Sequence, residues 1–192
     1  MPRFISLLLL CVMFSICWIT YIQWETTIAS FTQEIDISMG QYSLLWTVNG
    51  ILILVAQPLI QPVIRLLKGD LKKQMFVGVL IFMLSFFVTS FAQQFSIFMI
   101  GMIILTFGEM FVWPAIPTIA SKLAPRGKEG QFQGYVNSAS TVGKALGPFI
   151  GGVIVDTFDM SAMFLSMIGL LAISLVFLGV FDKVLPRKKE EE

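Results

Sequence analysis

The chain has 192 residues, of which 56% are hydrophobic and 13% are charged, and its mean hydropathy of +0.84 is too high for an ordinary soluble domain. Its formal net charge of +1 gives no indication of nucleic-acid binding. The sequence has no histidine, no P-loop and no C-x-x-C motif, so we expect no enzyme activity, no cofactor and no metal site.

Six long apolar stretches, separated by short loops, dominate the sequence. Each comes close to or exceeds the roughly 20 residues that a helix needs to cross a bilayer. We predict an all-α membrane protein with a six-helix transmembrane domain at residues 1–181 and a charged cytoplasmic tail at residues 182–192. A signal peptide is the alternative for residues 1–15, but the apolar run continues and no A-x-A-like cleavage site ends it. The spans are expected at residues 4–31, 42–64, 75–92, 96–121, 132–157 and 162–181.

Positive charge alternates from loop to loop along the chain. The loops at residues 33–41, 93–95 and 157–161 contain no Lys or Arg. Because short loops rich in Lys and Arg stay on the cytoplasmic side, we expect a multi-pass protein of the cell membrane with both termini in the cytoplasm. All basic residues except Lys144 lie at the start of the chain, in the remaining loops or in the tail: Arg3, Arg65, Lys68, Lys72, Lys73, Lys122, Arg126, Lys128, Lys183, Arg187, Lys188 and Lys189.

The first span carries two cysteines and two polar candidates for a substrate or proton pathway. Cys11 and Cys17 point about 120° apart on a helix, so we expect apolar packing and no disulfide. Gln23 and Glu25 lie in the outer third of the span. Glu25 belongs to the pathway or simply reaches water at the outer mouth, and the sequence leaves both roles open.

The second span adds further polar candidates on one side of a helix. Asn49, Gln57 and Gln61 occupy an arc of about 120°. Pro58 and Pro62 loosen the inner end of this helix. We predict that Asn49 and Gln57 belong to the same substrate or proton pathway.

Two ionisable residues lie near the middle of later spans. Glu109 is in the fourth span, with Trp113 one turn later on the same face, and Lys144 is in the fifth. A charge buried in lipid is costly, and antiparallel neighbours would place Glu109 and Lys144 at similar depth. An ion pair between them is therefore possible, as a structural pair or with Glu109 as a proton carrier. Trp113 suits flat, apolar or cationic substrates, and equally suits helix packing.

The fifth span also presents a polar face. Asn137, Thr141, Lys144 and Pro148 fall within about 60° of one another at 100° per residue. We expect this face to be directed towards a cavity, and we count Asn137, Thr141 and Lys144 among the pathway candidates.

A glycine pattern, G-x8-G-x3-G-P-x2-G-G, runs through the same span. Glycines that recur every four residues form a smooth stripe where another helix backbone can approach closely. The proline removes one backbone hydrogen bond and bends the helix. The predicted helix-packing residues are Gly134, Gly143, Gly147, Pro148, Gly151 and Gly152.

The glycine pattern resembles the antiporter motif of the major facilitator superfamily, drug:proton antiporter branch. Gly108-Glu109 and the residues after it look like the tenth helix and following loop of that branch, and Tyr21-x-Gln23 looks like its seventh helix. The G-x-L-a-D-R-x-G-R-K loop and the Arg-x-x-x-Gly signature of the first half are missing. The chain therefore looks like the C-terminal six helices of a twelve-helix transporter, built as two inverted three-helix repeats.

The resemblance implies a function. It implies half of a secondary active transporter that exports small amphipathic compounds in exchange for protons. The implied partners are the lipid bilayer, a small-molecule substrate, protons, and either a separately encoded N-terminal six-helix half or a second copy of the chain. Two other functions stay open: a transporter-derived structural or regulatory membrane fragment without transport activity, and a six-helix binding subunit of a vitamin transporter, which is not expected to carry the glycine pattern.

Overall fold

The computed structural model of the chain describes residues 2–67 and 69–181. In this part of the chain all regular elements are helical, and six segments are long and apolar enough to cross a membrane. The predicted all-α, six-span class is therefore confirmed. Lys68 and the predicted tail at residues 182–192 lie outside the described residues. The elements are α1 (Pro2–Tyr21), the 3₁₀ turn η1 (Ile22–Trp24), α2 (Thr27–Glu34), α3 (Met39–Leu66), α4 (Leu71–Thr89), α5 (Phe95–Leu123), α6 (Glu129–Thr157) and α7 (Met160–Val180).

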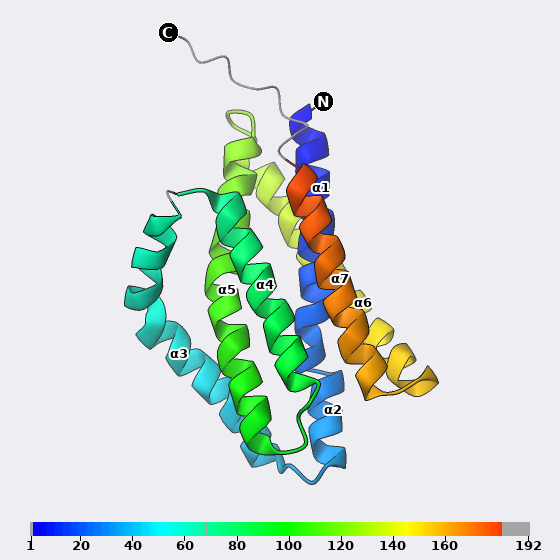
Figure 1. Cartoon of the computed structure of the whole chain (residues 1–192). Coiled ribbons are helices and arrows are strands. Elements are labelled where there is room, and N and C mark those ends of the chain that lie inside the picture. Colours follow the sequence, from blue (N-terminus) through cyan, green and yellow to red (C-terminus); the bar gives the residue numbers. More distant parts are fainter. Residues whose placement is uncertain (1, 68, 182–192) are drawn as a thin grey trace.

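The first span of each three-span set packs against the second and third spans of the other set. α1 packs against α6 and α7, and α5 correspondingly packs against α3 and α4. In Figure 1, α1 runs away from the end of the bundle that holds the N-terminus, whereas α5 runs towards it. Equivalent helices thus enter the bundle from opposite ends, as expected for two inverted three-helix repeats.

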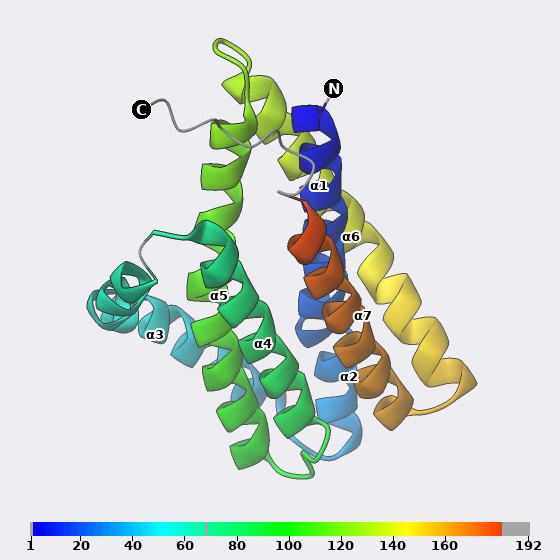
Figure 2. The same ribbon diagram turned by 45° about the horizontal axis from the view of Figure 1, so that its top comes forward.

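The core lies between α1, α4, α5 and α7. Leu10 of α1, Phe82 of α4, Met102 of α5 and Met167 of α7 are almost completely buried in one hydrophobic cluster. α3 and α6 lie on opposite flanks of the bundle (Figure 2) and bury the smallest share of their spans. Each of these two helices therefore presents a large uncovered face.

α6 packs against the first span through its glycine stripe. A Cβ atom at Gly143 would come within 2.5 Å of the Ser15 carbonyl oxygen, and Cβ atoms at Gly147 and Gly151 would overlap side chains of η1. Such a close approach of two helices requires residues without side chains. Space is open around an added Cβ at the two outer glycines of the motif, Gly134 and Gly152.

The first span is broken where it passes α6, since η1 separates α1 from α2. The Gln23 side chain is fully buried, and its Nε2 donates to the carbonyl oxygens of Ile19 and Gly147, each at 2.8 Å. The Trp24 carbonyl accepts a hydrogen bond from the Tyr42 hydroxyl. Side chains therefore satisfy backbone groups at the break, which lipid cannot do. The hydropathy of the sequence does not predict this break, because it averages over the whole span.

Candidate functional site

Glu109 lies midway along α5, where it is buried and binds side chains from two other helices. Its Oε1 accepts hydrogen bonds from the Tyr21 hydroxyl at 3.1 Å and from Asn49 Nδ2 at 2.8 Å. Asn49 Nδ2 also donates to the Thr106 hydroxyl at 2.9 Å. These four residues, which we call the Glu109 cluster, connect α1, α3 and α5 at one point.

The hydrogen-bond donors to Glu109 are neutral groups. A hydroxyl and an amide stabilise a carboxylate without neutralising it, so a proton or a cationic ligand can still bind there. Glu109 also lines a cavity of about 350 Å³, together with Gln57 and Trp113. The structure thus gathers four predicted pathway residues in one place: Asn49, Gln57, Glu109 and Trp113.

Aromatic rings from α1, α4 and α5 pack beside the Glu109 cluster. Trp18 and Trp113 are stacked, with ring centroids 4.7 Å apart and an interplanar angle of 9°. Tyr21 meets Trp113 edge-on at 5.4 Å, so the ring that donates to Glu109 also touches this stack. Phe14 and Phe82 contact Trp113 at 5.7 Å and 5.6 Å. We call these five residues the aromatic cluster.

Lys144 does not pair with Glu109. Its Nζ lies 3.9 Å from the centroid of the Trp18 ring, which is a cation–π contact, while Glu109 binds Tyr21 and Asn49. The predicted ion pair is therefore wrong. The reason is the rotation of α6: its glycine stripe packs on α1, and the neighbouring Lys144 side chain meets α1 rather than α5.

The remaining predicted pathway residues lie elsewhere. Asn137 and Thr141 are exposed on α6, where the Thr141 hydroxyl donates to the Asn137 carbonyl oxygen at 3.0 Å. Gln23 is buried in the contact between the first span and α6, and Glu25 is exposed at the helix break. The structure does not bring these four residues to the cavity beside Glu109.

Trp18 and Thr106 were not predicted as site residues, and Tyr21 was named only as part of the family resemblance. Trp18 and Tyr21 are three residues apart, as are Thr106 and Glu109. Residues at this spacing share a helix face. The spacing, combined with polar groups inside an apolar span, is the sequence signal that would have pointed to these residues.

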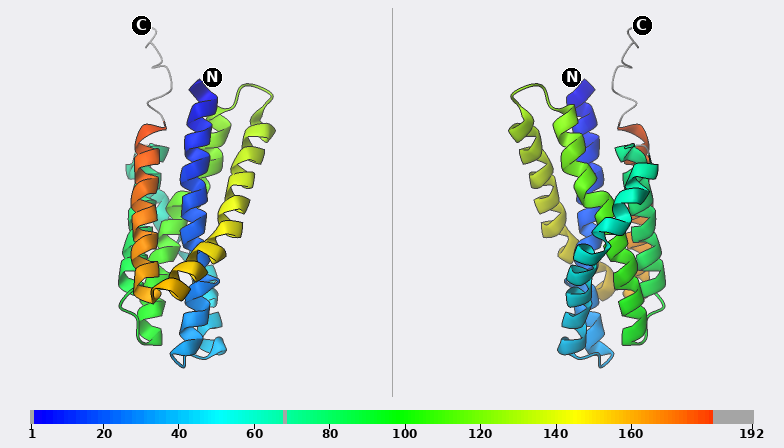
Figure 3. Two further views of the ribbon diagram at one scale, coloured as in Figure 1. Left: turned by 90° about the vertical axis from the view of Figure 1, so that its right-hand side faces the viewer. Right: turned by 90° about the vertical axis from the view of Figure 1, so that its left-hand side faces the viewer.

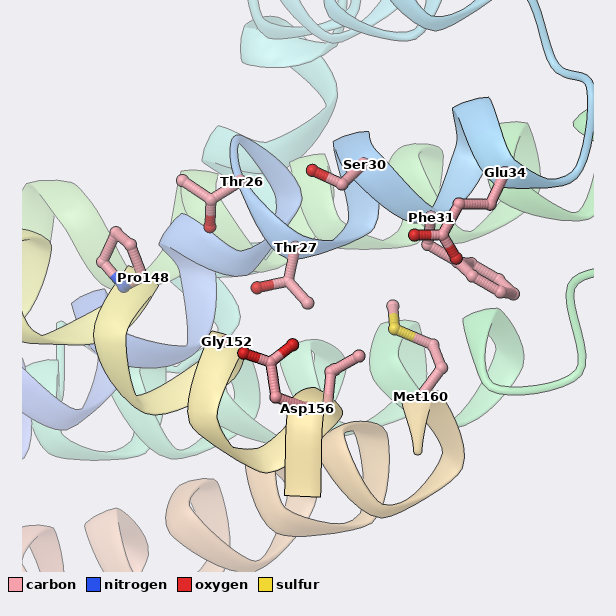
Figure 4. A pocket seen from close by; sticks show the side chains of 10 residues that line it. Thr26, Thr27, Ser30, Phe31, Glu34, Pro148, Gly152, Asp156 and Met160 are labelled. Carbon is pink, nitrogen blue, oxygen red and sulfur yellow. The ribbon is translucent and has the colours of Figure 1, made fainter. Parts of the chain in front are cut away.

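A larger cavity of about 520 Å³ lies between α2 and the adjoining ends of α6 and α7. Figure 4 shows hydroxyl side chains such as Thr27 on one side and the Asp156 carboxylate on the other. Its lining residues include none of the Glu109 cluster. Within residues 2–67 and 69–181, no group of three or more His, Cys, Asp or Glu side chains could hold a metal ion. We therefore place the candidate site at the Glu109 cluster.

The sequence profile of the Major Facilitator Superfamily matches residues 4–192, which include all six spans and the Glu109 cluster. The chain belongs to the major facilitator superfamily. Membership of the major facilitator superfamily agrees with the six apolar helices and identifies a multi-pass membrane protein of a transporter family. It also separates the chain from the vitamin-transporter subunits that the sequence left open.

Two curated relatives are also MFS-type transporters. The chain is 50% identical over 188 residues to the "Uncharacterized MFS-type transporter YttB" of Bacillus subtilis (strain 168), a match that covers 98% of this chain and 47% of the relative. It is 34% identical over 83 residues to the "Uncharacterized MFS-type transporter MJ1560" of Methanocaldococcus jannaschii. This second match covers 42% of this chain and 22% of that relative. The chain therefore spans half or less of the length of the curated relatives it matches.

Proposed function

We propose that the chain is one half of a proton-coupled efflux transporter of the drug:proton antiporter branch, equivalent to its C-terminal six helices, and that the transporter exports small amphipathic compounds. Superfamily membership, the glycine motif of α6 and the half-length match to YttB support this proposal. The observation that carries it is Glu109, a buried carboxyl group with neutral partners from two other helices at the wall of a cavity.

Glu109 is the proposed proton site. In the ionised state, its Oε1 accepts from Tyr21 and Asn49 and connects α1, α3 and α5. Hydrogen bonds to a charged acceptor are stronger than those to a neutral one. Protonation therefore weakens the connection between the three helices and favours a different arrangement around the cavity, which is how proton binding would shift the conformational equilibrium.

Trp113 of the aromatic cluster is the proposed contact surface for the substrate, and the other rings of the cluster pack around it. Trp113 lines the cavity with Glu109 and is stacked on Trp18. Flat apolar rings pack well on an indole ring, and a cationic group on the substrate is attracted both by Trp113 and by the Glu109 carboxylate. Trp18 already contacts the Lys144 ammonium group. A substrate cation and a proton would then compete for the same carboxylate, which couples export of one to entry of the other.

A second six-helix unit is the proposed partner. Polar and charged residues are exposed on the uncovered faces of α3 and α6, where contact with lipid would be costly. Covering these faces would bury the polar groups and complete the cavity. We favour an N-terminal half over a second copy of the chain, because the motifs resemble only the second half of such transporters. The exposed polar residues are Gln57, Gln61, Asn137, Thr141 and Lys144.

Both termini and the basic loops are proposed to face the cytoplasm. Single cysteines at Glu34 and Gln94, in a background without Cys11 and Cys17, should react with an impermeant maleimide added to intact cells. Both positions are exposed. Glu34 ends α2 and Gln94 precedes α5, and Figure 1 shows these helix ends at the end of the bundle opposite the start of α1. A cysteine at Arg126 should react only after the cells are opened. Reaction of that cysteine in intact cells would show that the protein has the opposite orientation.

Replacement of Glu109 by Gln tests the proton site. We expect folding stability to change by about 1 kcal/mol or less, because the amide oxygen still accepts hydrogen bonds. Substrate-driven proton movement should fall to background, because an amide carries no titrating proton. The measurement is dye-reported proton flux in liposomes that hold the chain and its second half.

Glu34→Gln is the matched control, since Glu34 is exposed and lies outside the Glu109 cluster. It should keep the wild-type flux. Full proton coupling in the Glu109→Gln variant would exclude Glu109 as the proton site. If the wild-type chain moves neither substrate nor protons with any second half, the chain is a membrane fragment without transport activity.

A further inference from the structure

A cavity of about 460 Å³ opens where α1 begins and where the α5–α6 loop leads into α6. These two places lie next to each other at one end of the bundle (Figure 3). The volume is in the range of small-molecule sites. The cavity is separate from the Glu109 and aromatic clusters, and its lining includes Arg3, Phe4, Lys128, Gln131, Phe132 and Tyr135.

Two cationic side chains from different elements line this cavity. Arg3 belongs to α1 and Lys128 is the residue before α6, and within the described residues neither side chain has a hydrogen-bond or ion-pair partner. Lys128 follows Gly127, whose φ of +78° favours glycine and fixes the turn. The Lys128 side chain makes no cap hydrogen bond to the first N–H groups of α6, and Glu129 is the acidic residue of the first turn. The carboxylate of Glu129 offsets the positive end of the helix dipole, so the positive charge at the cavity comes from Arg3 and Lys128.

The cavity has an aromatic wall. Phe4 and Tyr135 meet edge-on across α1 and α6, with ring centroids 5.9 Å apart, and Phe132 contacts Tyr135 at 6.5 Å. The Tyr135 hydroxyl accepts a hydrogen bond from Gln131 Nε2 at 3.0 Å. Tyrosines at this position along a spanning helix are typical of the boundary between headgroups and hydrocarbon.

Apolar side chains continue from the cavity towards the middle of the membrane. On α1, the exposed Leu8 and Val12 follow Phe4 at four-residue intervals, and on α6 the exposed Val142 and Leu146 follow Tyr135. Helical spacing keeps each set on one side of its helix. On α6 this side is opposite the polar face of Asn137, Thr141 and Lys144. The cavity is thus continuous with an apolar surface and not with the polar face proposed to meet the second half.

We propose that this cavity binds the headgroup of an anionic phospholipid, with Arg3 and Lys128 contacting its phosphate and the acyl chains lying along the exposed sides of α1 and α6. Lys and Arg at helix ends commonly extend to the interface without a specific partner. Here the two cations share one cavity with an aromatic wall, and basic pockets between helices are a recognised form of lipid-headgroup site. The additional positive group of a zwitterionic choline lipid would be repelled by Arg3 and Lys128.

Native mass spectrometry of the full chain in mild detergent tests the proposal, with dioleoyl phosphatidylglycerol and dioleoyl phosphatidylcholine supplied at equal concentration. The wild type should retain phosphatidylglycerol at least about tenfold better than phosphatidylcholine. Arg3→Gln/Lys128→Gln should lose this preference. Lys122→Gln/Arg126→Gln removes two exposed charges from the same end of the bundle, outside the cavity, and should keep it. Circular dichroism checks that all variants are equally helical.

Each contrary outcome has a definite meaning. Equal retention of both lipids by the wild type, or an equal loss in both double variants, would overturn the site in favour of general surface charge. Release of bound phosphatidylglycerol by excess inorganic phosphate would show a free-anion site and overturn the lipid assignment. If the full chain binds neither lipid but a chain ending at residue 181 binds phosphatidylglycerol, the cavity serves the last three residues of the tail, Glu190, Glu191 and Glu192, and the proposal fails.

Discussion

Reconstituted alone in liposomes, the chain is expected to move no substrate above the leak of protein-free liposomes. Within the described residues, the lining of the cavity beside Glu109 comes from α3 and α5, and exposed side chains of α3 and α6 such as Gln57 and Lys144 leave polar groups uncovered. Adding a six-helix partner should raise proton-driven export at least about tenfold. Only a cavity enclosed by two six-helix halves can close towards one face of the membrane while it opens towards the other. The part of YttB that this chain does not match is the first partner to test.

Cross-linking distinguishes the two possible partners. A cysteine at Thr141, which is exposed on the polar face of α6, should form a bond with the added half and not with a second copy of the chain. Cross-linked dimers of the chain would favour the two-fold arrangement instead. A chain that is monomeric by mass and yet transports substrate by itself would contradict the requirement for any second half.

Gly147→Leu is expected to separate α6 from the first span and to lower the free energy of unfolding by about 1–3 kcal/mol. A side chain at this position would overlap Ile22 and would also press on the backbone of Ile19, whose carbonyl oxygen lies 3.0 Å from the ideal Cβ position. The backbone cannot move aside as a flexible side chain can. The change would also displace the Gly147 carbonyl oxygen from Gln23 Nε2. Thermal unfolding in detergent, followed by circular dichroism, measures the loss.

Gly152→Leu provides the control, because it makes the same substitution in the same helix. No atom lies within 4 Å of an added Cβ at Gly152, and leucine favours a helix over glycine. The melting temperature of this variant should equal or exceed that of the wild type. Similar melting temperatures for the two leucine variants would show that the close contact at Gly147 does not hold the helices together.

Features that depend on one helix alone were accessible from the sequence. Six spans follow from hydropathy and length, and inverted repeats follow because each repeat has three spans, an odd number. Gly143, Gly147 and Gly151 were expected to form a packing stripe because their four-residue spacing places them on one face. Asn49, Gln57 and Glu109 were singled out because polar groups are rare and costly within a span. These inferences required no knowledge of which helices are neighbours.

The partners of each group were decided by the tertiary structure. Glu109 binds Tyr21 and Asn49, which are 88 and 60 residues away in the chain, and this depends on how α1 and α3 cross α5. Lys144 meets Trp18 because the glycine stripe sets the rotation of α6. The break at η1 is stable because Gln23 and Tyr42 supply hydrogen bonds from their places in the fold. A sequence records how deep each polar group lies in the membrane, whereas the packing of helix against helix determines which group it faces.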